Sequence, residues 1–287
     1  FEVLVRSGMP ADFAEVEKNF KEKYFEQALQ ALETQQTASK RGQLAHDHKM
    51  LMYACLGFAN AMQNNALEAK GAYRRVLPMW ANWRKESKAI MALEKDQAAG
   101  EKRVDNAIDA VGEALFFLAE EQRAKADEIV MPAYEGDSDP KTVKKYLSGK
   151  VKQWINRRAQ KVKKAAGEYA RVLKLEPKPP PRFVAAAASR VGAMHALMLE
   201  DLRTIAAPGD WAKEGKSAYV DPAKGKEPLD WKIVHDEFAK QLAEVVDPVK
   251  QAAADAYQAC VQASAKHGVK ADDVFLKSCK DWLDANP

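Results

Sequence analysis

The chain repeats one short pattern in three places: AKGAYRRVL (69–77), AAGEYARVL (165–173) and AADAYQACV (253–261). The first two copies agree at six of nine positions. Each copy has an alanine, an aromatic residue four positions later, and a small or branched apolar residue three positions after that. Residues at these offsets share one face of an α-helix, where alanine allows close approach of a neighbouring helix. The sequence therefore predicts a fold built from repeated, closely packed helices.

The first copy belongs to a longer motif that begins upstream. Its positions along the chain are Tyr53, Leu56, Gly57, Asn60, Ala69, Tyr73 and Val76. This order resembles the tetratricopeptide repeat, whose pattern is an aromatic residue, Leu-Gly, usually Tyr, then Ala, an aromatic residue and a small or apolar one. Asn60 departs from the usual Tyr, and Ala81 stands where the closing Pro is expected, whereas the second copy keeps it as Pro177.

This resemblance covers about half the chain and implies a right-handed solenoid of stacked helix pairs. It is good over 50–83, fair over 161–205 and 247–285, and poor between them. The stretch YFEQALQALE at 24–33 also resembles the second helix of such a repeat.

Apolar residues recur at intervals of three and four along almost the whole chain, without the alternation typical of strands. We therefore expect an all-α fold, an irregular tetratricopeptide-like right-handed solenoid. The expected helices are roughly 11–38, 43–63, 66–79, 84–98, 101–131, 141–175, 183–206, 231–245, 247–267 and 271–285. Two of them, about 101–131 and 141–175, are roughly twice as long as a standard repeat helix. The solenoid should be irregular there.

Turn-forming residues divide the chain into three expected parts. These are repeat-like helices over 1–100, a long charged helical hairpin over 101–175, and repeat-like helices over 176–287. In YEGDSDP (134–140), Asp139 is a predicted N-cap and Pro140 a predicted first helical residue. The connection 207–230 is unusually long for a compact fold, so it is either a partner-binding flap or a segment packed through Trp211, Tyr219 and Trp231.

A basic run extends from Lys141 to Lys164, with ten Lys or Arg and no Asp or Glu, although the whole chain has a formal net charge of only +4. One interpretation is internal pairing with the carboxylate ladder formed by Glu101, Asp105, Asp109 and Glu113. If residues 134–140 turn the chain back, the ladder should lie opposite Arg157, Arg158, Lys161 and Lys164. The other interpretation is a surface for an anionic partner.

The candidate binding cations are Lys144, Lys145, Arg157, Arg158, Lys161 and Lys164. Their partner could be an acidic protein, or a membrane surface or anionic polymer. We do not expect nucleic acid, because only Tyr146 and Trp154 interleave with the cations as stacking platforms.

The tetratricopeptide resemblance also implies a concave groove for a peptide or helical partner. By that resemblance the groove positions of the best repeat are Leu51, Ala54, Phe58, Ala61 and Met62. The expected function is thus a non-enzymatic protein-interaction scaffold, with an adaptor for an anionic surface or polymer through 141–164 as the alternative. A helical cell-wall-cleaving enzyme is the third hypothesis, with Glu113 as its candidate acid.

The cysteines and histidines suggest no metal site, cofactor or catalytic constellation, because there is no CxxC pair and no zinc-like His spacing. His195 is expected to be a packed histidine. Cys260 and Cys279 lie symmetrically about the turn KHGVKAD and are either a disulfide or two buried thiols. Cys55, inside the best repeat, is expected in the core.

The C-terminal stretch AYQACVQASAKHGVKADDVFLKSCKDWL resembles the terminal repeat of tetratricopeptide proteins of the deltaproteobacterial cell envelope, including myxobacterial gliding-motility components. It implies a periplasmic or envelope-associated scaffold, and the alternative location is the cytoplasm. No apolar stretch approaches the roughly 18 residues of a membrane span. The chain opens on Phe1 without a leader sequence, so we expect a processed product or an excised piece.

Overall fold

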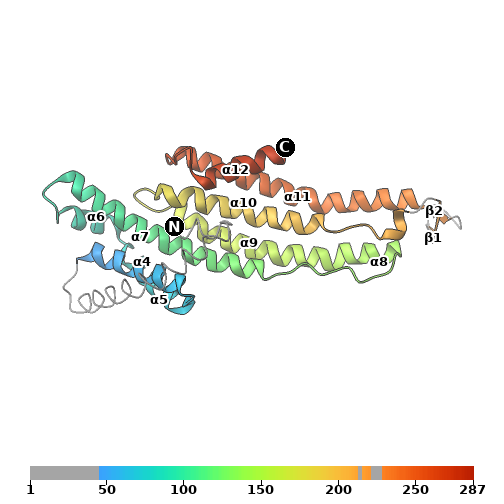
Figure 1. Cartoon of the computed structure of the whole chain (residues 1–287), viewed down its shortest axis with the longest axis horizontal. Helices are drawn as coiled ribbons and strands as arrows, with labels where there is room; N and C mark the ends of the chain where they lie inside the picture. Colours follow the sequence, from blue (N-terminus) through green and yellow to red (C-terminus); the bar gives the residue numbers. More distant parts are fainter. Residues whose placement is uncertain (1–44, 213–214, 221–227) are drawn as a thin grey trace, which may run out of the picture. The chain divides into compact units, whose positions relative to one another are not determined.

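The computed structural model describes residues 45–212, 215–220 and 228–287, and these residues form an all-α fold with one small hairpin (Figure 1). Its helices are α4 (His46–Met62), α5 (Ala66–Met79), α6 (Trp83–Met91), α7 (Gln97–Asp127), α8 (Pro140–Lys145), α9 (Lys152–Leu173), α10 (Pro181–Arg203), α11 (Trp231–Lys266) and α12 (Val274–Ala285). A π-helical turn, Tyr146–Val151, joins α8 to α9. The helix expected at 11–38 and the repeat-like stretch at 24–33 lie outside the described residues.

Most helix boundaries follow the local signals in the sequence. Asp139 caps α8 by accepting a hydrogen bond from the Lys141 backbone N–H at 2.9 Å, and Pro140 is the first helical residue, as predicted. The helix expected at 84–98 ends earlier, at Met91, and Asp96 then accepts from the Ala99 backbone N–H at 2.9 Å, just before the start of α7.

The prediction of separate helices at 231–245 and 247–267 was wrong, because α11 runs unbroken through Pro248. A proline inside a helix removes one backbone hydrogen bond and disfavours the preceding turn. In α11, buried residues lie on both sides of this proline: Val234 and Phe238 precede it, and Val249 and Ala253 come after it. The burial of apolar side chains along one face of α11 offsets the free-energy cost of the proline.

The chain divides into two compact units that differ from the three expected parts. Among the described residues, unit 1 consists of 45–121 together with 167–187 and 263–270. Unit 2 consists of 122–166, 188–262 and 271–287. The segment 101–175, expected as one charged hairpin, therefore contributes to both units.

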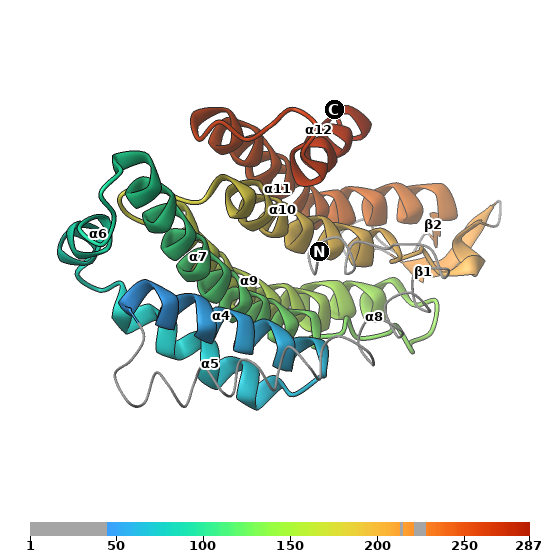
Figure 2. The same cartoon turned by 60° about the vertical axis from the view of Figure 1, so that its left-hand side comes forward.

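In unit 1, α4 and α5 lie side by side as a helical hairpin (Figures 1 and 2). The Tyr73 ring of α5 lies against Gly57 of α4, where an added Cβ would approach the ring to 2.8 Å. The same ring packs on Phe117 of α7, with centroids 4.6 Å apart, and its hydroxyl donates to Glu113 at 2.8 Å. One tyrosine thus joins three helices.

The second copy of the repeated pattern packs on another side of α7. Tyr169 lies 5.7 Å from the Phe116 ring between centroids, and its hydroxyl donates to the buried Glu120. Trp80, in the sequence MWANW, is buried and donates its indole N–H to the Glu176 carbonyl at 2.9 Å. Trp80 therefore packs in the interior of unit 1.

All nine positions of the three-residue pattern are buried. They are Ala69, Tyr73, Val76, Ala165, Tyr169, Val172, Ala253, Tyr257 and Cys260. In unit 2 the third copy repeats the contact of the first, because a Cβ on Gly192 of α10 would approach the Tyr257 ring of α11 to 2.6 Å. A tyrosine ring over a glycine of the preceding helix is therefore a shared packing feature of the first and third copies.

The long connection 207–230 contains a 3₁₀ turn (Gly209–Ala212) and a two-stranded antiparallel hairpin, β1 (Lys216–Val220) with β2 (Pro228–Asp230). Trp211 is buried, packs edge-to-face on Phe238 at 5.6 Å between centroids, and donates its indole N–H to the Ser138 carbonyl at 2.8 Å. The packing of Trp211 favours the interpretation as a packed segment over that as a flap, and Trp231 is half-buried. The side chain of Tyr219 lies outside the described part.

Candidate functional site

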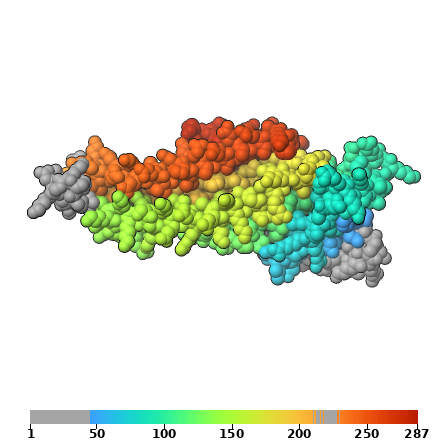
Figure 3. All heavy atoms as spheres, turned by 180° about the vertical axis from the view of Figure 1, so that it is seen from behind, coloured from blue at the N-terminus to red at the C-terminus, as the bar shows by residue number. Residues whose placement is uncertain are grey.

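The basic run occupies α8, the π turn and the first part of α9, all within unit 2. Of its ten cations, all but Arg158 are exposed: Lys141, Lys144, Lys145, Lys150, Lys152, Arg157, Lys161, Lys163 and Lys164. The atoms of this segment, coloured yellow-green, form a continuous part of the surface in Figure 3. We call these nine exposed cations the basic face.

The apolar side of the same segment explains why the cations point outward. Val143, Leu147, Val151, Trp154 and Val162 are buried. The Trp154 indole N–H donates to the Ile129 carbonyl at 3.0 Å, which fixes this side of α9 against the chain that precedes it. The remaining positions of an amphipathic helix must then face solvent.

Arg158 is the exception, with 3% of its side chain exposed. Its guanidinium forms an ion pair with Asp201 of α10, lies 3.9 Å from an Asp127 carboxylate oxygen, and lies 5.5 Å from the centre of the Trp154 ring. Arg158 was predicted as a binding cation, and this prediction was wrong because the side chain is buried in an internal ion pair. Nothing in the local sequence singled out Asp201 as its partner.

The predicted pairing between the carboxylate ladder and this helix was also wrong. Asp105 forms an ion pair with Lys178 at 2.8 Å, and Glu113 lies 3.7 Å from Arg182. Partial burial raises the pKa of Asp109, although Arg182 and Lys178 act in the opposite direction. The predicted register assumed a tight turn near 136, whereas α7 ends at Asp127 and α8 begins only at Pro140.

Three cations of the basic face form a compact row on α9. Arg157, Lys161 and Lys164 follow one another at steps of four and three, which places them on one side of an α-helix. Within the part of the chain that the structure describes, none of the three forms an ion pair or a side-chain hydrogen bond. Their charges are therefore available to an external partner.

The groove predicted from the first repeat is only partly accessible. Of its five residues, Ala54 and Met62 are buried, while Leu51, Phe58 and Ala61 are half-buried. Met62 belongs to a core cluster with Ala59, and Phe58 packs against that cluster. Ala54 and Met62 therefore contribute to the core rather than to a binding surface.

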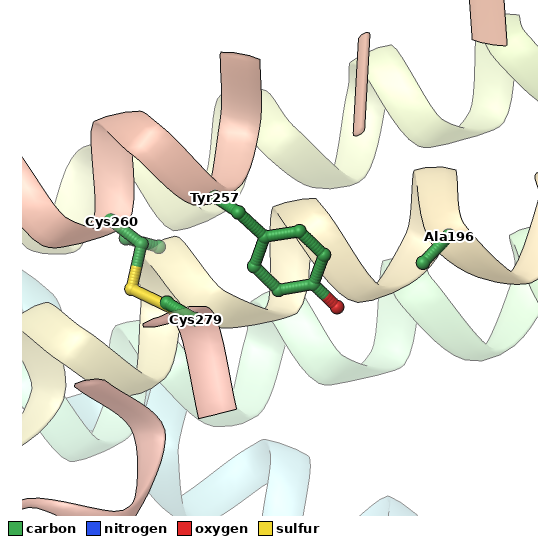
Figure 4. Close-up of a cluster of buried hydrophobic side chains, with 5 residues drawn as sticks. Ala196, Tyr257, Cys260 and Cys279 are labelled. Carbon is green, nitrogen blue, oxygen red and sulfur yellow. A yellow bond between two sulfur atoms is a disulfide. The ribbon is translucent and has the colours of Figure 1, made fainter. Parts of the chain in front are cut away.

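Cys260 of α11 and Cys279 of α12 form a disulfide, with their Cα atoms 6.5 Å apart (Figure 4). They share a buried cluster with Ala188 and Ala196 of α10 and with Tyr257, whose ring stacks on Trp282 at 4.7 Å between centroids. Burial raises the pKa of Tyr257 to about 12.

Cys55, which we expected in the core, is exposed. Partial desolvation and the nearby Glu113 carboxylate raise the pKa of its thiol. Its place on α4 explains the difference, because its neighbours Ala54 and Leu56 take the buried positions and leave Cys55 on the outer side. A raised thiol pKa makes this cysteine a weak nucleophile.

The candidate acid Glu113 and His195 both contact other parts of the fold. Glu113 accepts a hydrogen bond from Tyr73, so it lacks the unpaired environment of a general acid. His195 is half-buried, and burial lowers its pKa. Within 45–212, 215–220 and 228–287, no group of three His, Cys, Asp or Glu side chains could hold a metal ion. None of the helices in these residues combines the length and the apolar character of a membrane span.

Comparisons of this chain with protein-family models, with curated proteins and with solved structures gave no match. Among the predicted binding residues, Lys144, Lys145, Arg157, Lys161 and Lys164 share one exposed segment.

Proposed function

We propose that the protein is a non-catalytic, tetratricopeptide-like scaffold, a right-handed solenoid that binds an acidic protein partner through its basic face. The observation that carries the proposal is the exposure of nine cations on one helical segment that contains no carboxylate. Such a surface attracts an anionic partner and raises its rate of encounter. The row Arg157, Lys161 and Lys164 forms its C-terminal part.

The tetratricopeptide-like architecture is supported by the packing of the repeated pattern. The three copies bury equivalent residues, and the first and third copies place a tyrosine ring over a glycine of the preceding helix. Repeats that bury equivalent residues against their neighbours are typical of helical solenoids. The long helices α7 and α11 would be the irregular elements of this solenoid.

An acidic protein suits this surface better than nucleic acid or a membrane. Tyr146 and Trp154, the two aromatic residues within the basic run, are both buried, so they form no exposed series of rings on which successive bases of a strand could stack. The apolar side of the segment is buried as well, so it has no apolar face to insert into lipid. What remains accessible is positive charge, which matches clustered carboxylates.

We further propose that the protein works in an oxidising compartment, as part of a bacterial periplasmic or envelope assembly. The disulfide between Cys260 and Cys279 supports this location, because structural disulfides are rare in the reducing cytoplasm. The resemblance of the C-terminal stretch to envelope proteins of the gliding-motility type points to the same compartment.

The proposal is tested by titrating the whole chain with a fluorescein-labelled peptide of alternating glutamate and serine and measuring anisotropy. We expect saturable binding that weakens steeply between about 50 and 300 mM NaCl, because exposed charges are screened over this range. Reversing the row with Arg157→Glu, Lys161→Glu and Lys164→Glu should lower affinity about tenfold or more.

A matched control reverses three exposed lysines elsewhere in unit 2: Lys232→Glu, Lys240→Glu and Lys277→Glu. This variant has the same net charge as the row variant, so it should keep its affinity within about twofold if the location of charge matters. Equal loss in both variants would contradict a localised site. Tighter binding to anionic vesicles or to single-stranded DNA than to the peptide would contradict the choice of partner.

A further inference from the structure

A cavity of about 460 Å³ opens at the π turn, in unit 2, between the turn and the extended segment that precedes α8. Tyr134, Tyr146, Lys145, Lys150 and Thr142 contribute to its wall. Its volume lies in the range of small-molecule sites, roughly 300–1,000 Å³. A site of this kind is separate from the row of cations on α9.

The π turn brings the two lysines of the wall together. In an α-helix of about 3.6 residues per turn, residues five apart face different sides. Here the Lys152 backbone N–H bonds to the Leu147 carbonyl, five residues back, which is the π pattern. This wider turn aligns residues five apart, so Lys145 and Lys150 both reach the cavity. Single π turns inside helices are frequent at functional sites.

The aromatic part of the wall is held in place by hydrogen bonds to the backbone. The Tyr146 hydroxyl donates to the Pro132 carbonyl at 2.7 Å, and the Tyr134 hydroxyl donates to the Asp137 carbonyl at 2.5 Å. The two rings are tilted by 56°, with centroids 5.0 Å apart. Because the hydroxyl groups are engaged elsewhere, the rings offer the cavity their apolar surfaces.

Two glycines, Gly136 and Gly149, contribute to the wall of the cavity. An added Cβ at Gly136 would approach the Tyr134 ring to 2.6 Å, so a larger residue there would displace the ring. Gly149, also in the wall, has open space where a Cβ would lie. The hydrogen bonds of the two tyrosine hydroxyls hold the rings in place before a ligand binds, which reduces the entropy lost on binding.

Charge and shape together indicate the ligand. Lys145 and Lys150 are exposed and form no ion pair with the described residues, so two ammonium groups in the wall have no counter-charge from this part of the chain. Glu135 is the one carboxylate in the wall. Tyrosine rings favour a flat apolar group, and the Thr142 hydroxyl can donate to an oxyanion.

We propose that this cavity binds a small organic anion in which a flat aromatic ring carries a phosphate or a carboxylate. The ring packs on Tyr134 and Tyr146, and the anionic group contacts Lys145 and Lys150. This site goes beyond the proposed function, since it needs neither the α9 row nor an acidic protein.

The test is isothermal titration calorimetry of the whole chain with two ring-bearing anions, adenosine 5′-monophosphate and 2-naphthoate. Adenosine supplies a ring without the charge, and inorganic phosphate supplies the charge without a ring. We expect saturable binding of at least one ring-bearing anion with a Kd of about 1 mM or tighter, and binding of adenosine and phosphate at least about tenfold weaker. No saturable binding of either ring-bearing anion, or equal binding of adenosine and its monophosphate, overturns the proposal.

Variants locate the site. The double substitution Lys145→Gln and Lys150→Gln should lower the affinity at least about tenfold while leaving the helical circular dichroism unchanged, because both side chains are exposed. The matched control, Lys161→Gln and Lys164→Gln, should bind the anion as the unmodified chain does. Equal weakening by both double variants would show diffuse charge attraction and overturn the proposal. The control substitutes two of the three cations of the α9 row and spares the cavity. Loss of anion binding in the cavity variant and loss of peptide binding in the row variant therefore test the two proposals separately.

Discussion

The ion pair between Arg158 and Asp201 makes a sharp prediction about stability. Removing the carboxylate with Asp201→Ala leaves a guanidinium that is 3% exposed without its nearest counter-charge. Breaking a buried ion pair from one side destabilises proteins by about 3–5 kcal/mol. Asp201 itself is 35% exposed and Asp127 stays 3.9 Å from the guanidinium, so we expect about 2–3 kcal/mol here.

The opposite change should be milder. In Arg158→Met the buried charge disappears, an apolar side chain of similar length stays against Trp154, and the half-exposed Asp201 can be hydrated. The buried Arg158 Nε, which has no hydrogen-bond acceptor among the described atoms, disappears too. Replacing a buried ion by an apolar residue is often neutral, so we expect a loss of about 1 kcal/mol or less.

Urea unfolding followed by circular dichroism and tryptophan fluorescence measures both effects. With an m-value of about 3 kcal/mol/M, Asp201→Ala should lower the midpoint by roughly 0.7–1 M, and Arg158→Met by about 0.3 M or less. The exposed neighbour supplies a control, because Arg157→Met should change stability by about 0.5 kcal/mol or less. If Arg158→Met is more destabilising than Asp201→Ala, the reasoning about a buried, desolvated charge is refuted.

Three further predictions concern the packing of the helices. Gly192→Ala should lower the free energy of unfolding in urea by about 1–3 kcal/mol, because the new Cβ would meet the Tyr257 ring at 2.6 Å. The control Gly71→Ala has open space for its Cβ and should be neutral or stabilising, and the reverse order of the two variants would contradict the packing. Replacing Cys260 and Cys279 by serine should lower stability by about 3 kcal/mol, and an unchanged midpoint would argue against the disulfide in solution. Burial lowers the pKa of His195 in the folded state. Its contribution to stability is therefore complete above the ordinary pKa of 6.5 and is lost as pH falls below that value. In urea unfolding, His195→Gln should lose less stability between pH 7 and pH 5 than the unmodified chain does.

Much of the secondary structure could be predicted because its signals are local. Asp139 and Pro140 start α8 as predicted, since an N-cap and a first-turn proline act through their own backbone neighbours. Local signals failed at Pro248, where burial on both sides keeps α11 continuous. The π turn also lacked a clear sequence signal, so the cavity beside it was not predicted.

By itself, the sequence determined the helical character of the described chain and the buried positions of the repeated pattern. Spacing of three and four residues determines which side chains share a face, and the shared alanine and tyrosine mark the side that is buried. It also determined that positive charge would be concentrated in 141–164.

Tertiary structure decided which of these charges remain accessible. Arg157 and Arg158 are adjacent and chemically identical, yet one is exposed and the other is buried against Asp201. Helical periodicity determines that adjacent residues point to different sides of the helix. Only the packing of α10 against α9 determines which of these sides is buried. The same limit applied to the cysteines, because the pairing of Cys260 with Cys279 depends on the approach of α12 to α11.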